Sequence, residues 1–100
     1  MAELNWDEIE DRSITIEAIT ANPPCPGCLE LMQVVAEVGL EHGSKLNIIN
    51  YVGKMGNEIF KKYGLTCVPA VVVNETVRIM GVAPSKETLI KAIGEAAGQL

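Results

Sequence analysis

Hydrophobic and polar residues recur along this chain with two different periods. Near the N-terminus they alternate, with Ile14, Ile16 and Ala18 on one side of an extended segment and Thr15 and Glu17 on the other. Such alternation is typical of a β-strand. From residue 29 to residue 40 apolar positions instead recur every three or four residues, which is the period of a helix. The pattern therefore predicts a strand followed closely by a helix.

The same alternation of periods continues to the C-terminus. The predicted elements are a strand over 13–20, a helix over 26–41, a strand over 46–52, a helix over 54–63, strands over 68–74 and 76–80, and a last helix that Ser85 caps. A tight turn at Asn74-Glu75 makes the last two strands a hairpin. The residues expected in the core include some of Leu29, Met32, Val35 and Val38 in the first helix and Leu89, Ile90, Ile93 and Ala97 in the last. The order β-α-β-α-β-β-α predicts an α/β domain with helices on both faces of one sheet.

The first twelve residues have a different character from the rest. They contain five acidic residues and one arginine, with Leu4, Trp6 and Ile9 as apolar anchors. We expect residues 1–12 to form an N-terminal appendage on a domain that spans residues 13–100, and two alternatives are open for it: an edge strand or helical turn packed on the domain, or a frayed tail.

Length and charge narrow the class of protein. One hundred residues predict a single domain. The longest uncharged apolar run, residues 68–73, is far shorter than a membrane span. A net charge of −5 argues against binding to nucleic acid, which requires a basic surface. The N-terminus lacks the basic start and apolar stretch of a secretory signal, so we expect a cytoplasmic protein that is a monomer.

The chemistry of the chain centres on Cys25-Pro26-Gly27-Cys28, at the predicted junction between the first strand and the first helix. There Cys25 is expected to be the N-cap and Pro26 the first helical residue, where a missing N–H is no loss. Free amides at the helix start then face the Cys25 sulfur and favour its thiolate. Cys28 lies three residues on, on the same helical face. The spacing predicts a disulfide that is made and broken.

A proline occupies an awkward position further along the chain. Pro69 opens the strand-like run Val71-Val72-Val73, where it removes a backbone donor from the sheet. Two interpretations are open on the residues alone. The proline takes a first or edge position in the strand, or the peptide bond between Val68 and Pro69 is cis.

Taken together, these motifs resemble the thioredoxin/glutaredoxin superfamily over residues 13–100. The resemblance rests on Cys25-Pro26-Gly27-Cys28, on residues 57–69 and on residues 81–87, and it is most similar to the small thioredoxin-like proteins of archaea and anaerobic bacteria. It implies a thioredoxin-like domain with a central four-stranded mixed sheet flanked by helices. It also implies that Pro69 is cis and faces the cysteine pair, and that the Val68 backbone binds an extended substrate as an added strand.

The function that this resemblance implies is thiol–disulfide exchange, with reduction of protein disulfides. Cys25 attacks the substrate disulfide and Cys28 resolves the mixed disulfide, while Pro26 and Gly27 tune the reduction potential. The redox-active disulfide between the two cysteines is the only redox group expected, with no further cofactor and no metal. Disulfide-containing client proteins and an upstream enzyme of the thioredoxin-reductase type are the expected partners.

The chain also departs from the family pattern. Pro24, rather than a tryptophan, precedes the first cysteine. Ile19 stands where thioredoxins place a buried aspartate, so the proton of Cys28 needs another route, through water or through Glu17 if that residue faces inward. The glutathione-binding segment of glutaredoxins is absent at Gly81-Val82, which argues against glutathione as the dedicated reductant.

A third cysteine leaves two further alternatives open. Cys67 is either a small buried apolar residue or a partly exposed thiol near Cys25, able to form an oxidative dimer. The alternative function is a metal-binding module in which Cys25, Cys28 and Cys67 supply thiolates to zinc or an iron–sulfur cluster.

Overall fold

The computed structural model describes residues 4–98. Its helices and strands are β1 (Ile14–Thr20), α1 (Pro26–His42), β2 (Leu46–Val52), α2 (Asn57–Tyr63), β3 (Ala70–Val73), β4 (Val77–Met80) and α3 (Lys86–Ala96). Three short 3-10 helices accompany them, η1 (Trp6–Glu8), η2 (Gly43–Lys45) and η3 (Gly53–Gly56). The element order confirms the β-α-β-α-β-β-α prediction.

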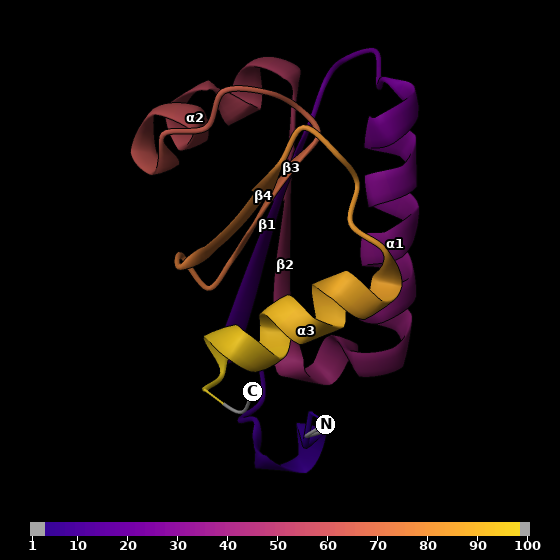
Figure 1. Cartoon of the computed structure of the whole chain (residues 1–100), viewed down its shortest axis with the longest axis vertical. Coiled ribbons are helices and arrows are strands. Elements are labelled where there is room, and N and C mark those ends of the chain that lie inside the picture. Colours follow the sequence, from indigo (N-terminus) through magenta and orange to yellow (C-terminus); the bar gives the residue numbers. More distant parts are fainter. Residues whose placement is uncertain (1–3, 99–100) are drawn as a thin grey trace.

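The strands form one mixed sheet in the order β2-β1-β3-β4. β1 runs parallel to β2 and antiparallel to β3, and β4 completes an antiparallel hairpin with β3. α1 and α3 cover one face of the sheet and α2 lies on the other (Figure 1). The junction between β1 and α1 lies at one end of the sheet, and both chain termini lie toward the opposite end (Figure 1). The predicted four-stranded mixed sheet with helices on both faces is confirmed.

Each face of the sheet has its own hydrophobic core. The larger core, under α1 and α3, includes Ile14, Ile16, Leu31, Val35, Val38, Val71, Leu89 and Ile93. The smaller core, under α2, consists of Ile19, Tyr63, Leu65, Ala70 and Val72 with partly buried neighbours. Of the residues expected to be buried on α1, Val35 and Val38 are buried while Leu29 and Met32 are exposed. The buried stripe of α1 instead runs through Cys28 and Leu31.

Two elements begin two or more residues later than the pattern predicted. The helix expected from residue 54 begins as the 3-10 helix η3 and becomes α-helical only at Asn57. Strand β3 begins at Ala70, rather than at residue 68, because Pro69 has no N–H to donate to a neighbouring strand. The predicted turn at Asn74-Glu75 is confirmed, with φ of 51° and 64° at the two residues and a hydrogen bond from the Thr76 N–H to the Val73 carbonyl, although three residues, 74–76, connect the paired Val73 and Val77.

The N-terminal segment packs on the body of the protein as a helical turn. The Trp6 ring stacks on His42, near the end of α1, with ring centroids 3.7 Å apart. Ile9 is buried in the larger core. Over residues 4–12 this confirms the expected packing, and residues 1–3 lie outside the described part of the chain; the division of the chain after residue 12 stays a prediction. In residues 4–98 no helix has both the length and the apolar character that a membrane span demands.

Candidate active site

Cys25 and Cys28 lie at the start of α1, as predicted. Cys25 is the N-cap, and its Sγ accepts a hydrogen bond of 3.1 Å from the Cys28 N–H. Pro26 follows as the first helical residue. Cys25 is partly exposed, whereas Cys28 is fully buried. Both are free thiols in this structure. The sulfur of the partly exposed cysteine therefore lies at a helix N-terminus, where amide donors stabilise negative charge.

The buried thiol of Cys28 has its own donor. Its Sγ accepts a hydrogen bond of 3.4 Å from the Ala21 N–H, in the loop between β1 and α1. Burial raises the pKa of the Cys28 thiol, but hydrogen bonds from the Ala21 amide and from Cys25 outweigh burial and hold its pKa below the ordinary value. No sequence pattern indicated that Ala21 would contribute to the site, because it contributes its backbone N–H, which every residue except proline has.

Pro69 lies against the cysteine motif. The peptide bond between Val68 and Pro69 is cis, as the resemblance implied. A Cβ placed on Gly27 would lie 3.2 Å from both Cγ and Cδ of Pro69. Gly27 thus allows the first turn of α1 to approach the proline ring closely, since even a methyl group is crowded there. The structure brings Cys25, Gly27, Cys28 and Pro69 together in one site.

Cys67 is exposed, which excludes the buried alternative. Its Sγ lies 3.1 Å from the position that a Cβ on Gly81 would take, so it packs against the segment that leaves β4. The nearby Thr66 hydroxyl approaches both Cys67 Sγ, at 3.9 Å, and Met80 Sδ, at 3.5 Å. Cys67 is accessible to solvent on the loop that leads to Pro69.

A cavity of about 340 Å³ opens beside this site, on the α2 face of the sheet. It is bounded by the end of β1 and the loop after it, by η3 and α2, and by Val68. The lining residues are Ile19, Thr20, Ala21, Asn22, Gly53, Lys54, Gly56, Asn57, Phe60 and Val68. Ala21 also donates to Cys28, and Val68 directly precedes Pro69. The cavity is therefore adjacent to both halves of the site.

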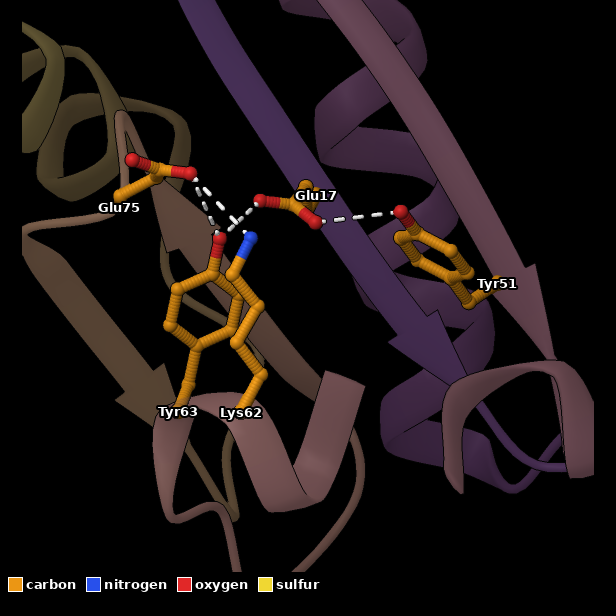
Figure 2. A network of polar contacts seen from close by, with 5 residues as sticks. All are labelled: Glu17, Tyr51, Lys62, Tyr63 and Glu75. Atoms are coloured by element: carbon orange, nitrogen blue, oxygen red, sulfur yellow. Dashed lines mark hydrogen bonds and ion pairs between the residues drawn. The ribbon is translucent and has the colours of Figure 1, made fainter. Parts of the chain in front are cut away.

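Glu17 faces inward on β1 but does not bond with the cysteines. It is only 6% exposed, and its carboxylate accepts hydrogen bonds from the hydroxyls of Tyr51, at 3.2 Å, and Tyr63, at 2.7 Å (Figure 2). The hydrogen bonds of Cys28 involve Ala21 and Cys25 instead. The sequence analysis did not identify the two tyrosines, although a single charged residue on a mostly apolar strand was a signal that polar partners would be needed.

The metal-binding alternative finds no support in the geometry. Across the described part of the chain, no three side chains among histidine, cysteine, aspartate and glutamate gather into a group that could hold a metal ion. Cys67 in particular does not join Cys25 and Cys28 in such a group.

Known proteins provide an independent comparison. A family model described as thioredoxin domain matches residues 14–94. Over 82 residues, 38% are identical to a probable thioredoxin from Methanothermobacter thermautotrophicus, covering 82% of this chain and 94% of that protein. A probable thioredoxin from Methanothermobacter marburgensis is 37% identical over the same shares of both chains.

Solved structures agree on the fold. An uncharacterized thioredoxin-like protein from Clostridium perfringens aligns with a TM-score of 0.70 and 22% identity, covering 92% of this chain and 77% of that chain. A mutant thioredoxin from Halobacterium salinarum aligns with a TM-score of 0.67 and 18% identity, covering 90% and 80% of the two chains.

Proposed function

Because the chain belongs to the thioredoxin family, we propose that it reduces disulfide bonds in client proteins with the dithiol of Cys25 and Cys28. The family supports a general role in thiol–disulfide exchange. The observation that carries the finer proposal is the asymmetry of the pair. Cys25 is partly exposed and its Sγ accepts an amide hydrogen bond at 3.1 Å, whereas Cys28 is buried. An attacking thiol must reach a client, whereas a resolving thiol needs to reach only its partner.

In the proposed reaction the Cys25 thiolate attacks one sulfur of the client disulfide. The client S–S bond breaks, a mixed disulfide forms, and the other client sulfur leaves as a thiolate that takes up a proton. Cys28, as its thiolate, then attacks the Cys25 sulfur and releases the second client thiolate. Two electrons pass to the client, and the protein is left with a disulfide between Cys25 and Cys28.

Client binding is assigned to the loop that contains Val68 and Pro69. An extended client segment beside the Val68 backbone would add a short strand at the site. The contact between Gly27 and Pro69 supports this placement, because it sets how closely the loop approaches the cysteines. Pro26 and Gly27 would also tune the reduction potential through the first turn of the helix.

Electrons are proposed to arrive from an upstream enzyme of the thioredoxin-reductase type rather than from glutathione. The dithiol would carry them without a further cofactor. We propose a cytoplasmic monomer, since a reducing compartment keeps such a dithiol available. Under oxidation the exposed Cys67 would allow a disulfide-linked dimer.

Single serine variants test the proposed roles of the two thiols. Cys28→Ser should trap client proteins on Cys25 as mixed disulfides, visible on non-reducing gels and released by a thiol reductant. Cys25→Ser should reduce no client disulfide and trap none. Cys67→Ser is the matched control, because it also removes one thiol, and it should retain the wild-type reduction rate.

Activity in the Cys25→Ser variant would contradict the proposal. Loss of activity in Cys67→Ser together with normal activity in Cys25→Ser would assign the attack to the other exposed thiol. Coupling the wild-type protein in turn to a flavin reductase with NADPH, to a ferredoxin-dependent reductase and to glutathione identifies the electron source.

A further inference from the structure

The buried carboxylate of Glu17 has no part in the proposed chemistry, yet it is costly to bury. A carboxylate removed from water is strongly destabilising unless hydrogen bonds compensate for the lost hydration. Here each oxygen accepts one tyrosine hydroxyl, Oε1 from Tyr63 at 2.7 Å and Oε2 from Tyr51 at 3.2 Å (Figure 2). An apolar residue would fill this strand position without that cost, so the bonds themselves point to a role.

The two tyrosines lie at the two ends of one segment. Tyr51 is the last residue but one of β2, and η3 follows this strand directly. Tyr63 is the last residue of α2. Glu17 therefore holds both the entry and the exit of residues 53–63 against the middle of the sheet.

Residues 53–63 form part of the wall of the cavity beside the cysteines and lead to the loop to which client binding is assigned. We call this cavity and the Val68–Pro69 loop the client side of the site. Gly53, Gly56 and Phe60 line the cavity beside the cysteines. Beyond its exit, residues 64–68 lead directly to Pro69. A displacement of the segment would therefore move the cavity wall and the loop that faces Gly27 together.

An outer pair completes the network but contributes less. Lys62 forms an ion pair of 3.3 Å with Glu75 in the hairpin turn, and Glu75 also lies 3.5 Å from the Tyr63 hydroxyl. Lys62 and Glu75 are exposed, and pairs of this kind add little. The buried acceptor is the member of the network on which the arrangement depends.

We propose that Glu17 is a positioning residue for client binding, which fixes the η3–α2 segment, and with it the Val68–Pro69 loop, through Tyr51 and Tyr63. The inference rests on the proposed function. It assigns to Glu17 the affinity for protein disulfides and leaves the reactivity of the thiols to the start of α1. A carboxylate suits this role because both of its oxygens accept, whereas a glutamine amide offers one accepting oxygen and leaves one tyrosine without its acceptor.

The test compares Glu17→Gln, Tyr51→Phe and Tyr63→Phe on two substrates. One is a folded protein disulfide, and the other is a small symmetrical aromatic disulfide that needs no client surface. We expect KM for the protein disulfide to rise roughly 2- to 30-fold in Glu17→Gln, as for other residues that act through a network. The kcat, and the rate with the small disulfide, should stay within about twofold. Tyr63→Phe should have a larger effect than Tyr51→Phe, since its bond is shorter and buried.

Controls separate positioning from general stability. Glu58→Gln makes the same chemical change at an exposed position on α2 and should leave KM unchanged. The double variant Glu17→Gln/Tyr63→Phe should raise KM by less than the product of the two single effects, because both substitutions disrupt the same hydrogen bond between Glu17 and Tyr63. The chain contains only two tyrosines, both bonded to Glu17, so tyrosinate absorbance during alkaline titration reports directly on the network.

The outcomes separate the positioning role from the proposed function. Variants that melt at lower temperature but keep the wild-type KM would overturn the positioning role and leave Glu17 a purely structural residue. If Glu17→Gln fails to fold, the two phenylalanine variants decide the question on the same criterion. A wild-type protein that reduces neither substrate would overturn the proposed function itself.

Discussion

Gly56 offers the sharpest test of how η3 packs on β1, because almost no space separates it from Ile19. A Cβ placed on Gly56 would lie 2.5 Å from Ile19 Cγ2, and 3.8 Å and 3.9 Å from two further carbons of that side chain. Ordinary contacts between carbons are about 3.5–4.0 Å, so Gly56→Ala requires a displacement of roughly 1 Å. The methyl of a β-branched side chain cannot swing aside easily, and Ile19 is only 1% exposed.

The expected cost follows from two opposing effects. Overpacking of a close contact costs about 1–3 kcal/mol. Gly56 has φ of −83° and ψ of −8°, which alanine adopts readily, so a less flexible unfolded chain returns about 0.4–1 kcal/mol. The net loss should be about 1–2 kcal/mol. For a domain of this size that lowers Tm by roughly 4–16 °C.

Urea denaturation of the reduced protein measures the difference in unfolding free energy. Gly43→Ala is the matched control, because its Cβ position has open space within 4 Å and its φ is −59°. That variant should be neutral or slightly more stable. Ile19→Leu removes the Cγ2 methyl that the new Cβ would meet. In the Gly56→Ala background it should therefore recover part of the lost stability, whereas as a single substitution it should not stabilise the protein. Equal stability of Gly56→Ala and Gly43→Ala would refute the close packing of η3 on β1.

Three further predictions concern the site and the network. Gly27→Ala should lower kcat/KM for protein disulfides roughly 2- to 10-fold, by crowding Pro69, and should lower the small-disulfide rate less; equal effects on both substrates would contradict this. Burial first, and then the bonds to a buried carboxylate, raise the pKa of Tyr51 and Tyr63. The folded state therefore favours the protonated phenols. The contribution of the two tyrosines to the unfolding free energy should be fully present below about pH 10 and should be lost as pH rises through their raised pKa values. An unfolding free energy that does not change across that range would contradict this prediction. Mild oxidation with diamide should give a disulfide-linked dimer that Cys67→Ser does not form, and a persistent dimer in that variant would assign the link to another thiol.

The start of α1 could be predicted because its determinants are local. A cysteine followed by proline satisfies the preferences of the N-cap and the first helical position, and the structure places Cys25 and Pro26 accordingly. The capping of α3 by Ser85 follows from the same kind of rule. The placement of Pro69 beside the motif came from the family resemblance, since no local rule brings together residues about forty positions apart.

The contacts that escaped prediction all join residues distant in sequence. Glu17 could be placed on the face of β1 opposite the larger core, but its tyrosine partners lie 34 and 46 residues away. Periodicity indicates which face of a strand a residue occupies. It does not indicate which residues from distant parts of the sequence pack on that face. The packing of η3 on β1 is equally hidden from periodicity, because the close approach of Gly56 to Ile19 is a tertiary contact.

The buried carboxylate on β1 has a different position, and different partners, from the one that the thioredoxin pattern places beside the cysteines. Thioredoxins place a buried aspartate where Ile19 stands here, whereas this chain carries its buried carboxylate two residues earlier on the same face, about 6.6 Å further from the cysteines along the strand. Ile19 is apolar and packs against η3, so it can neither give nor take a proton. The buried sulfur of Cys28 relies on the Ala21 amide, a donor that does not titrate. A carboxylate freed from the cysteines in this way is available to hold the η3–α2 segment, and thereby the client side of the site, in place.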